Sequence, residues 1–139
     1  MKIKYEFKGN FDKALKKCRE DLERELKGVI GVHTRNVSLA AKRLAPVDKG
    51  LLRNSIHPEI KDLTGEVIAN AEYAPYREFG TGNKVNVPPE LTDYAMQFKG
   101  KGIRQVNTKA QPFLYPAMDA EKNKFFQDCD DKIKKVLNQ

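Results

Sequence analysis

The longest regular pattern in the chain is FDKALKKCREDLERELKGVIGVHTRNVSLAAKRL, residues 11–44. Its apolar residues recur at the three- and four-residue spacing of an amphipathic helix. They are Phe11, Leu15, Cys18, Leu22, Leu26, Val29, Ile30, Val37, Ala40, Ala41 and Leu44. Asn10 is placed to cap the first turn, and Gly28 and Gly31 are places where the helix could bend. If it is continuous, this helix is about 50 Å long, longer than a domain this small is wide.

The segment before this helix has the pattern of a strand. Residues 2–8, KIKYEFK, alternate polar and apolar side chains. The alternation predicts a half-buried strand with Ile3, Tyr5 and Phe7 on one face. We expect this strand to be able to pair with a hairpin that follows the long helix.

Pro46 ends the long helix, residues 48–50 form a turn, and residues 51–56 lead into extended chain. Two strand-like pieces follow, residues 57–63 and 66–71. The turn residues Thr64 and Gly65 lie between them, which predicts a β-hairpin.

The second half of the chain combines a long loop with a second helix. Residues 74–79 form a short helical turn with Pro75 near its first position, and residues 80–111 are rich in Gly, Asn, Lys and Pro without a sustained period. We read 80–111 as a long flexible loop with a short helix near residues 91–98; loops of this length are usually functional. Pro116 is predicted to start the last helix.

These elements predict one α+β domain over residues 1–139. A small, mainly antiparallel sheet is packed by one long N-terminal helix and one C-terminal helix. The long loop lies between the hairpin and the last helix. Cys18 and Cys129 lie far apart without a CxxC spacing, which indicates two reduced thiols, neither a disulfide nor a zinc site.

The chain is basic, with 26 Lys and Arg against 19 Asp and Glu and a net charge of +7, which favours anionic partners. The basic residues are spread along the chain among acidic ones, Trp is absent, and no nucleic-acid reading motif is present. A channel that DNA merely passes through is compatible with this charge. No apolar stretch is long enough to cross a bilayer, and no signal sequence is visible, so we expect a soluble protein made inside the cell.

No reaction centre is predicted. His33 lies in the long helix and His57 at a strand edge, without a metalloprotease, nucleophile-elbow, P-loop or dinucleotide motif. Glu72 and Glu78 bracket an aromatic segment and could mimic a catalytic carboxylate pair, but acid–base chemistry needs a cleft and shifted pKa values. Asp48 stands in a Pro/Gly turn, where Asp commonly bonds its own backbone. We therefore expect no catalytic residue, cofactor or metal.

The segment between Glu72 and Gly82 carries two structural expectations. Gly80 is expected to cap the preceding helical turn in a left-handed conformation, and Gly82 to free the chain to leave as a loop. Tyr73, Tyr76 and Phe79 are either local core or a partner-facing anchor, since aromatic residues dominate both settings.

Three segments stand out together, in this order: APVDKGLLRNSI (45–56), VIANAEYAPYREFGTG (67–82) and AQPFLYPA (110–117). Their order and spacing resemble the family of siphophage tail and neck components named after the tenth gene product of phage HK97. The resemblance marks sixteen positions as structural or assembly residues: Pro46, Asp48, Gly50, Leu52, Ser55, Tyr73, Tyr76, Glu78, Phe79, Gly80, Thr81, Gly82, Pro112, Phe113, Leu114 and Pro116.

The resemblance implies a structural, non-enzymatic virion protein of a phage or prophage, without a cofactor. It implies a tail-completion or head-to-tail joining (neck) component that forms a ring through which DNA passes. Its partners would be copies of itself, in a hexamer or larger ring, and neighbouring connector or stopper and tail-tube or tail-terminator proteins. It would contact passing DNA without sequence preference and bind no membrane. It would lie in the virion tail or neck, and in the host bacterial cytoplasm during assembly.

Two alternatives stay open at this point. One is a tail terminator or another minor tail protein. The other, from a different class, is a basic nucleic-acid-binding module.

Overall fold

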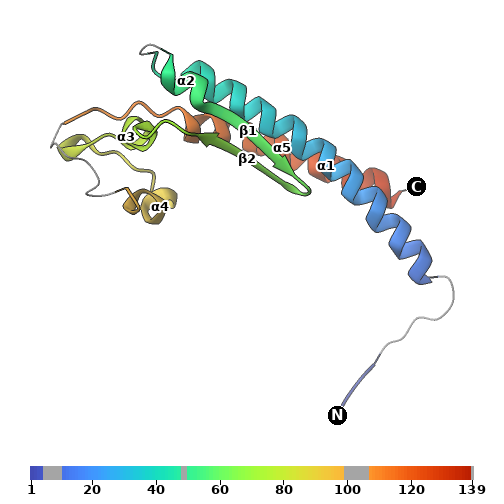
Figure 1. The fold of residues 1–139 in the computed structure, drawn as a ribbon. Helices are drawn as coiled ribbons and strands as arrows, with labels where there is room; N and C mark the ends of the chain where they lie inside the picture. The colour runs from blue at the N-terminus through green and yellow to red at the C-terminus, as the bar shows by residue number, and fades with distance from the viewer. Residues whose placement is uncertain (5–10, 48–49, 99–106, 139) are drawn as a thin grey trace.

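A computed structural model describes residues 1–4, 11–47, 50–98 and 107–138 of the chain. The fold is α+β, as predicted: a two-stranded antiparallel hairpin and two long helices, with a loop before the last helix (Figure 1). The elements are α1 (Phe11–Leu44), α2 (Leu51–Ser55), β1 (Ile56–Lys61), β2 (Thr64–Ala69), α3 (Ala74–Phe79), η1 (Gly82–Lys84), η2 (Pro89–Leu91), α4 (Thr92–Met96) and α5 (Leu114–Leu137).

The two long helices form the body of the molecule. α1 is a single helix of 34 residues, so Gly28 and Gly31 do not interrupt it. α5 lies along α1 in the opposite direction, and the N-terminal end of α1 extends past the end of α5 (Figure 1). Near the C-terminal end of α5, the carboxylate of Glu25 on α1 forms ion pairs with two lysines of α5, Lys135 at 3.3 Å and Lys132 at 3.4 Å. Lys135, and then Lys132, lower the pKa of Glu25.

The hairpin packs against the middle of α1. β1 and β2 pair from Ile56 opposite Ala69 to Lys61 opposite Thr64, so the turn is Asp62–Leu63. The prediction that Thr64 and Gly65 form the turn is therefore wrong by two residues. Asp62 takes the positive φ of 51° that the turn needs, a conformation Asp tolerates better than most residues.

Gly65 has a packing role that explains the misplaced turn. A Cβ at this position would overlap Oγ1 of Thr34, and it would lie 3.0 Å from Cγ2 of Ile30. The strand can approach the helix this closely only because Gly65 has no side chain. The glycine marks a helix–strand contact and not a turn.

Two further strand predictions are corrected. Leu51–Ser55 is the short helix α2, begun by Gly50 at φ 73°, and extended chain starts only at Ile56. Residues 1–4 form no strand, and Ile3 is 71% exposed; Tyr5 and Phe7 lie outside the described residues. α1 begins at Phe11, roughly 30 Å along its axis from Ile30, against which the hairpin packs.

The buried core is small and lies at one end of the molecule. It forms where the C-terminal end of α1, α2, the start of β1, α3 and the start of α5 meet. Its members are Ala41, Ala45, Leu52, Ile56, Ala74, Phe113 and Ala117.

The remaining predictions concern the loop, the cysteines and the membrane. The predicted loop, 80–111, contains η1, η2 and α4, and α4 falls within the expected 91–98; residues 99–106 lie outside the described residues. Cys18 and Cys129 are both free thiols, as predicted. None of the helices in the described part of the chain has the length and apolar composition needed to span a membrane.

Candidate functional site: the junction of three sequence segments

The three segments singled out in the sequence meet in the core. The first contributes Ala45, Leu52 and Ile56, the second contributes Ala74, and the third contributes Phe113 and Ala117. Leu52, Ile56 and Phe113 are each about 1% exposed and are the largest fully buried side chains among the described residues. Large buried apolar side chains provide most of the stabilisation in a small core. Through these side chains the three segments join the C-terminal end of α1 to the start of α5.

Glu78 joins the second segment to the third. Its side chain is buried, and both carboxylate oxygens face the N-terminus of α5. Oε2 accepts the backbone N–H of Phe113 at 2.8 Å and of Leu114 at 2.9 Å, while Oε1 accepts that of Tyr115 at 2.9 Å. A carboxylate is favoured here because the first N–H groups of a helix lack partners and carry partial positive charge. Glu78 is thus the N-terminal cap of a helix that begins 36 residues later in the chain.

Pro116 completes this cap. The first four N–H groups of a helix have no partner within the helix. At α5 three of these belong to Phe113, Leu114 and Tyr115, which Glu78 binds, and the fourth position is Pro116, which has no N–H. The helix starts at Leu114, so the prediction that Pro116 starts it is wrong by two residues. Together the glutamate and the proline leave none of these donors unsatisfied.

The interpretation of Glu72 and Glu78 as a catalytic carboxylate pair finds no support in this geometry. Glu72 is exposed, whereas Glu78 is buried and binds three backbone N–H groups. Those bonds occupy both oxygens of Glu78 in a structural contact.

Gly80 is required by the backbone at the end of α3. Its φ of 77° is positive, as predicted, but its ψ of 179° places it outside the left-handed helical region, in a conformation nearly restricted to glycine. Its N–H donates to the carbonyl of Tyr76 and closes the helical turn. A Cβ here would lie 2.5 Å from the carbonyl oxygen of Lys84 and 2.9 Å from that of Thr108. Any side chain at Gly80 would push two backbone segments apart.

Thr81 and its neighbours tie the two ends of the long loop together. Thr81 donates its N–H to the carbonyl of Thr108 at 2.9 Å, and its Oγ1 accepts the N–H of Thr108 at 2.8 Å. The N–H of Gln111 donates to the carbonyl of Arg77 at 2.7 Å. The residues on either side of the loop therefore lie next to each other: φ is 60° at Gly82, and the N–H of Asn83 donates to Oδ1 of Asn107 at 3.2 Å.

The aromatic residues of the second segment belong mainly to the interior. Phe79 is buried, and Tyr73 packs against the core cluster; Tyr76 is half-buried. The Phe79 ring meets Tyr94 of α4 edge-on at 6.4 Å, and Tyr94 meets Phe98 at 5.4 Å. Tyr73 and Phe79 are local core, and Phe79 is also the residue against which α4 packs.

The first segment ends one helix and starts another. Gly50 opens α2 with positive φ, Ser55 closes it by donating its hydroxyl to the carbonyl of Leu52 at 2.7 Å, and Pro46 is half-buried. Nε of Arg53 donates to the carbonyl of Lys42 at 2.9 Å. The positively charged guanidinium group of Arg53 therefore lies at the C-terminal end of α1, where the helix dipole favours positive charge. Asp48 lies outside the described residues.

The family model described as "Bacteriophage HK97-gp10, putative tail-component" matches residues 5–80, more than half of the chain. The chain belongs to the HK97-gp10-like family of phage tail components. No curated protein and no solved structure matches it. Members of this family are described as structural components of the phage tail, which implies a non-enzymatic role.

The HK97-gp10-like match covers the first segment and the second as far as Gly80, and ends before the third. The tie from Glu78 to Phe113 and the shared core therefore bring the third segment, outside the matched region, into the same unit. Pro112 is exposed beside this contact, and Leu114 packs against the core cluster. The contacts that these family-like residues make hold the fold rather than perform chemistry.

One contact of this HK97-gp10-like chain was missed by the sequence reasoning. His33 of α1 is only 4% exposed, and its ring nitrogens lie 2.7 Å from Oε1 of Glu121 and 2.7 Å from Oδ2 of Asp128, both on α5. The Phe125 ring packs edge-on against it at 5.5 Å. His33 thus joins the two long helices at mid-length. The seven-residue spacing of the two acids on one helix face was the sequence signal, but their partner could not be inferred locally.

The carboxyl of Glu121 is bound from two sides. The amide of Asn36 donates to its Oε1 at 3.0 Å and lowers the pKa of Glu121, against the effect of desolvation, and His33 lowers it further. On the same helix, burial and then the neighbouring Asp128 raise the pKa of the Cys129 thiol, so this cysteine is held as a thiol rather than a reactive thiolate.

His57 has only local contacts. It lies in β1, and its ring nitrogens contact the carbonyl of Ser55 at 3.1 Å and the carboxylate of Glu59 at 3.3 Å. Within the described ranges, no group of three or more His, Cys, Asp and Glu side chains is placed to hold a metal ion.

Proposed function

We propose that this protein is a tail-completion or head-to-tail joining component in the neck of a tailed phage or prophage virion. In this role its copies form a ring, a hexamer or larger, through which DNA passes. The partners on either side are a connector or stopper protein and a tail-tube or tail-terminator protein. The protein is present in the host bacterial cytoplasm until it joins the virion.

The observation that carries the proposal is membership in the phage tail-component family combined with the fixed base of the loop. The hydrogen bonds between Thr81 and Thr108 and from Gln111 to Arg77 hold both ends of the loop together beside α3. A loop anchored in this way can contact a partner without disturbing the helices and the hairpin. Loops of this length often provide binding surfaces.

The exposed apolar residues agree with a protein that functions in contact with others. On the loop they include Val85 (53% exposed), Tyr94 (51%) and Met96 (56%), which lie within 12 residues of each other. Aromatic residues and methionine are enriched where protein surfaces meet. We expect this end of the molecule to contact a neighbouring virion protein.

The test is genetic and structural. A phage lacking this gene is expected to produce separate heads and tails in electron micrographs, and a plasmid copy of the gene is expected to restore joined particles. Antibody labelling should place the protein between the head and the tail tube. Firmly joined, infectious particles without the protein would contradict the joining role. Labelling at another tail position would favour a tail terminator or minor tail protein.

The net charge of +7 favours one alternative function, a basic nucleic-acid-binding module. That function predicts micromolar or tighter DNA affinity for the isolated chain, with a steep dependence on salt. An isolated chain that does not bind DNA at low salt would remove this alternative. Passage of DNA through a ring does not require such affinity.

A further inference from the structure

We infer that neighbouring copies of this chain bind each other through the outer face of the hairpin and a basic groove on α1. The inference rests on the proposed ring and names the two surfaces that would form its subunit contact. A ring of identical subunits needs two different, complementary surfaces on each copy. Such a pair of surfaces exists among the described residues.

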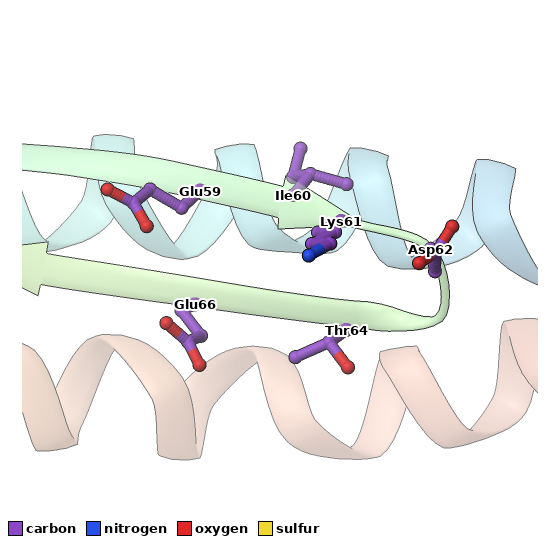
Figure 2. Close-up of a pocket in the computed structure, with 6 residues that line it drawn as sticks. All are labelled: Glu59, Ile60, Lys61, Asp62, Thr64 and Glu66. Atoms are coloured by element: carbon purple, nitrogen blue, oxygen red, sulfur yellow. The ribbon is translucent and has the colours of Figure 1, made fainter.

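The first surface is the outer face of the hairpin, which carries acidic side chains. Gly65 faces α1, so its cross-strand partner Ile60 lies on that side, and residues 59, 61, 64 and 66 lie on the opposite side. Glu59 and Glu66 are directly opposite each other in the register, and both are exposed (Figure 2). Like charges at opposite positions of a hairpin destabilise it unless a cation lies between them.

The outer face of the hairpin has fewer positive than negative side chains. Figure 2 shows Lys61 and Asp62 near the same turn, so the four charged residues of this surface carry three negative charges and one positive. Nε2 of His57 lies 3.3 Å from Glu59. No basic group in the described part of the chain lies within ion-pair distance of Glu66. This face therefore attracts a cationic partner, although the whole chain is positively charged.

The second surface is a groove at the C-terminal end of α1, lined by Leu39, Lys42, Arg43 and Arg53. Leu39 is 52% exposed, so the groove combines an apolar floor with three cationic side chains. Neither Lys42 nor Arg43 forms an ion pair with an acid among the described residues. Arg53 is held in place through its bond to the carbonyl of Lys42. The groove is complementary in charge to the outer face of the hairpin.

The two surfaces lie on different sides of α1, which prevents them from meeting within one copy. The hairpin packs on α1 at Ile30 and Thr34. At about 100° per residue, Leu39 lies about 140° around the helix axis from Thr34 and about 180° from Ile30. A contact from one side of a subunit to the other side of the next is head-to-tail, which is the kind of contact that closes rings.

The experiment reverses the charges of each surface in the full chain. The hairpin variant is Glu59→Lys with Glu66→Lys, and the groove variant is Lys42→Glu with Arg43→Glu. Arg53 stays unchanged because it binds the end of α1. A combined variant carries all four changes and restores opposite charges with reversed sign. The matched control, Glu20→Lys with Asp131→Lys, makes the same change in net charge as the hairpin variant at exposed sites on α1 and α5.

Assembly is measured in particles produced by the complemented deletion phage. A carbodiimide, which joins carboxylates to amines in contact, should link Glu66 to Lys42 between copies. The linked peptide should occur in the dimer band of a denaturing gel and not in the monomer band. The hairpin and groove variants should each reduce joined particles about tenfold or more, while the combined variant and the control should retain them.

The outcomes separate this inference from the proposed function. Suppose that the protein lies in the neck, that both charge-reversed variants assemble normally, and that particles with the parent chain give no Glu66–Lys42 link. The subunit contact is then wrong and the joining role stands. If the hairpin and groove variants fail to assemble and the combined variant also fails, the pairing of these two surfaces is likewise wrong. Absence of the protein from the particles would remove both proposals.

Discussion

The cap formed by Glu78 allows a direct test of how the fold is held together. We consider Glu78→Ala, which removes the acceptor of three backbone N–H groups at the start of α5. A charge-assisted hydrogen bond stabilises a protein by about 1.5–3 kcal/mol, and a buried donor without a partner costs about 1–3 kcal/mol. The N–H of Phe113 is buried, whereas the bonds of Leu114 and Tyr115 are part-buried.

Water can replace part of the lost contact at Leu114 and Tyr115, so the three bonds do not add in full. We expect the free energy of unfolding to fall by about 4 kcal/mol in Glu78→Ala. This change corresponds to a decrease in Tm on the order of 10–20 °C for a chain of this size. Glu78→Gln keeps one carbonyl oxygen but turns an NH₂ group toward a backbone N–H, and should cost about 1–3 kcal/mol.

The assay is urea unfolding followed by far-ultraviolet circular dichroism, with a thermal scan at the same protein concentration. The matched control is Glu72→Ala, which removes the same charge from an exposed position earlier in the same segment. It should remain within about 0.5 kcal/mol of the parent chain. A loss below about 1 kcal/mol in Glu78→Ala would refute the assignment of Glu78 as the cap of α5.

Three further predictions test the backbone and the helix contact. Gly80→Ala should destabilise the protein by about 3 kcal/mol or more, because φ is positive and a Cβ would meet backbone atoms. The matched variant Gly28→Ala adds a Cβ that meets nothing within 4 Å, and it should stabilise the protein by about 0.5–1 kcal/mol. Equal unfolding midpoints for the two variants would contradict the special role of Gly80. The pKa of Glu121 is lowered in the folded chain, so its contribution to the free energy of unfolding is fully present above its ordinary pKa of 4.5 and is lost as pH falls through the lower folded value. Glu121→Gln should therefore reduce the loss of stability at acidic pH in a profile of unfolding free energy against pH. An unchanged profile would contradict the stabilising role of the Glu121 carboxylate. Gly65→Ala should lower Tm through its overlap with Thr34, and adding Thr34→Ala should recover part of the loss; no recovery would mean that the strand is displaced by another contact.

The local patterns of the sequence determined the elements that depend on neighbouring residues. The helical spacing of apolar residues predicted α1, which runs unbroken over Phe11–Leu44. The strand-like pieces predicted the hairpin, and the glycine after Phe79 predicted the positive φ at Gly80. The order and spacing of the three segments also indicated the family. These features follow from local backbone and side-chain preferences, so a local pattern can show them.

Other features depended on contacts between residues far apart in the chain. Glu78 had the local setting of a possible catalytic carboxylate, and only the approach of α5, which begins 36 residues later, makes it a helix cap. His33 meets acids 88 and 95 residues away, and Gly65 is fixed by its contact with α1 rather than by a turn. Hydrogen bonding and close packing act only over a few ångströms. Which side chains come within that range is decided by the tertiary structure, where the helices and the hairpin meet.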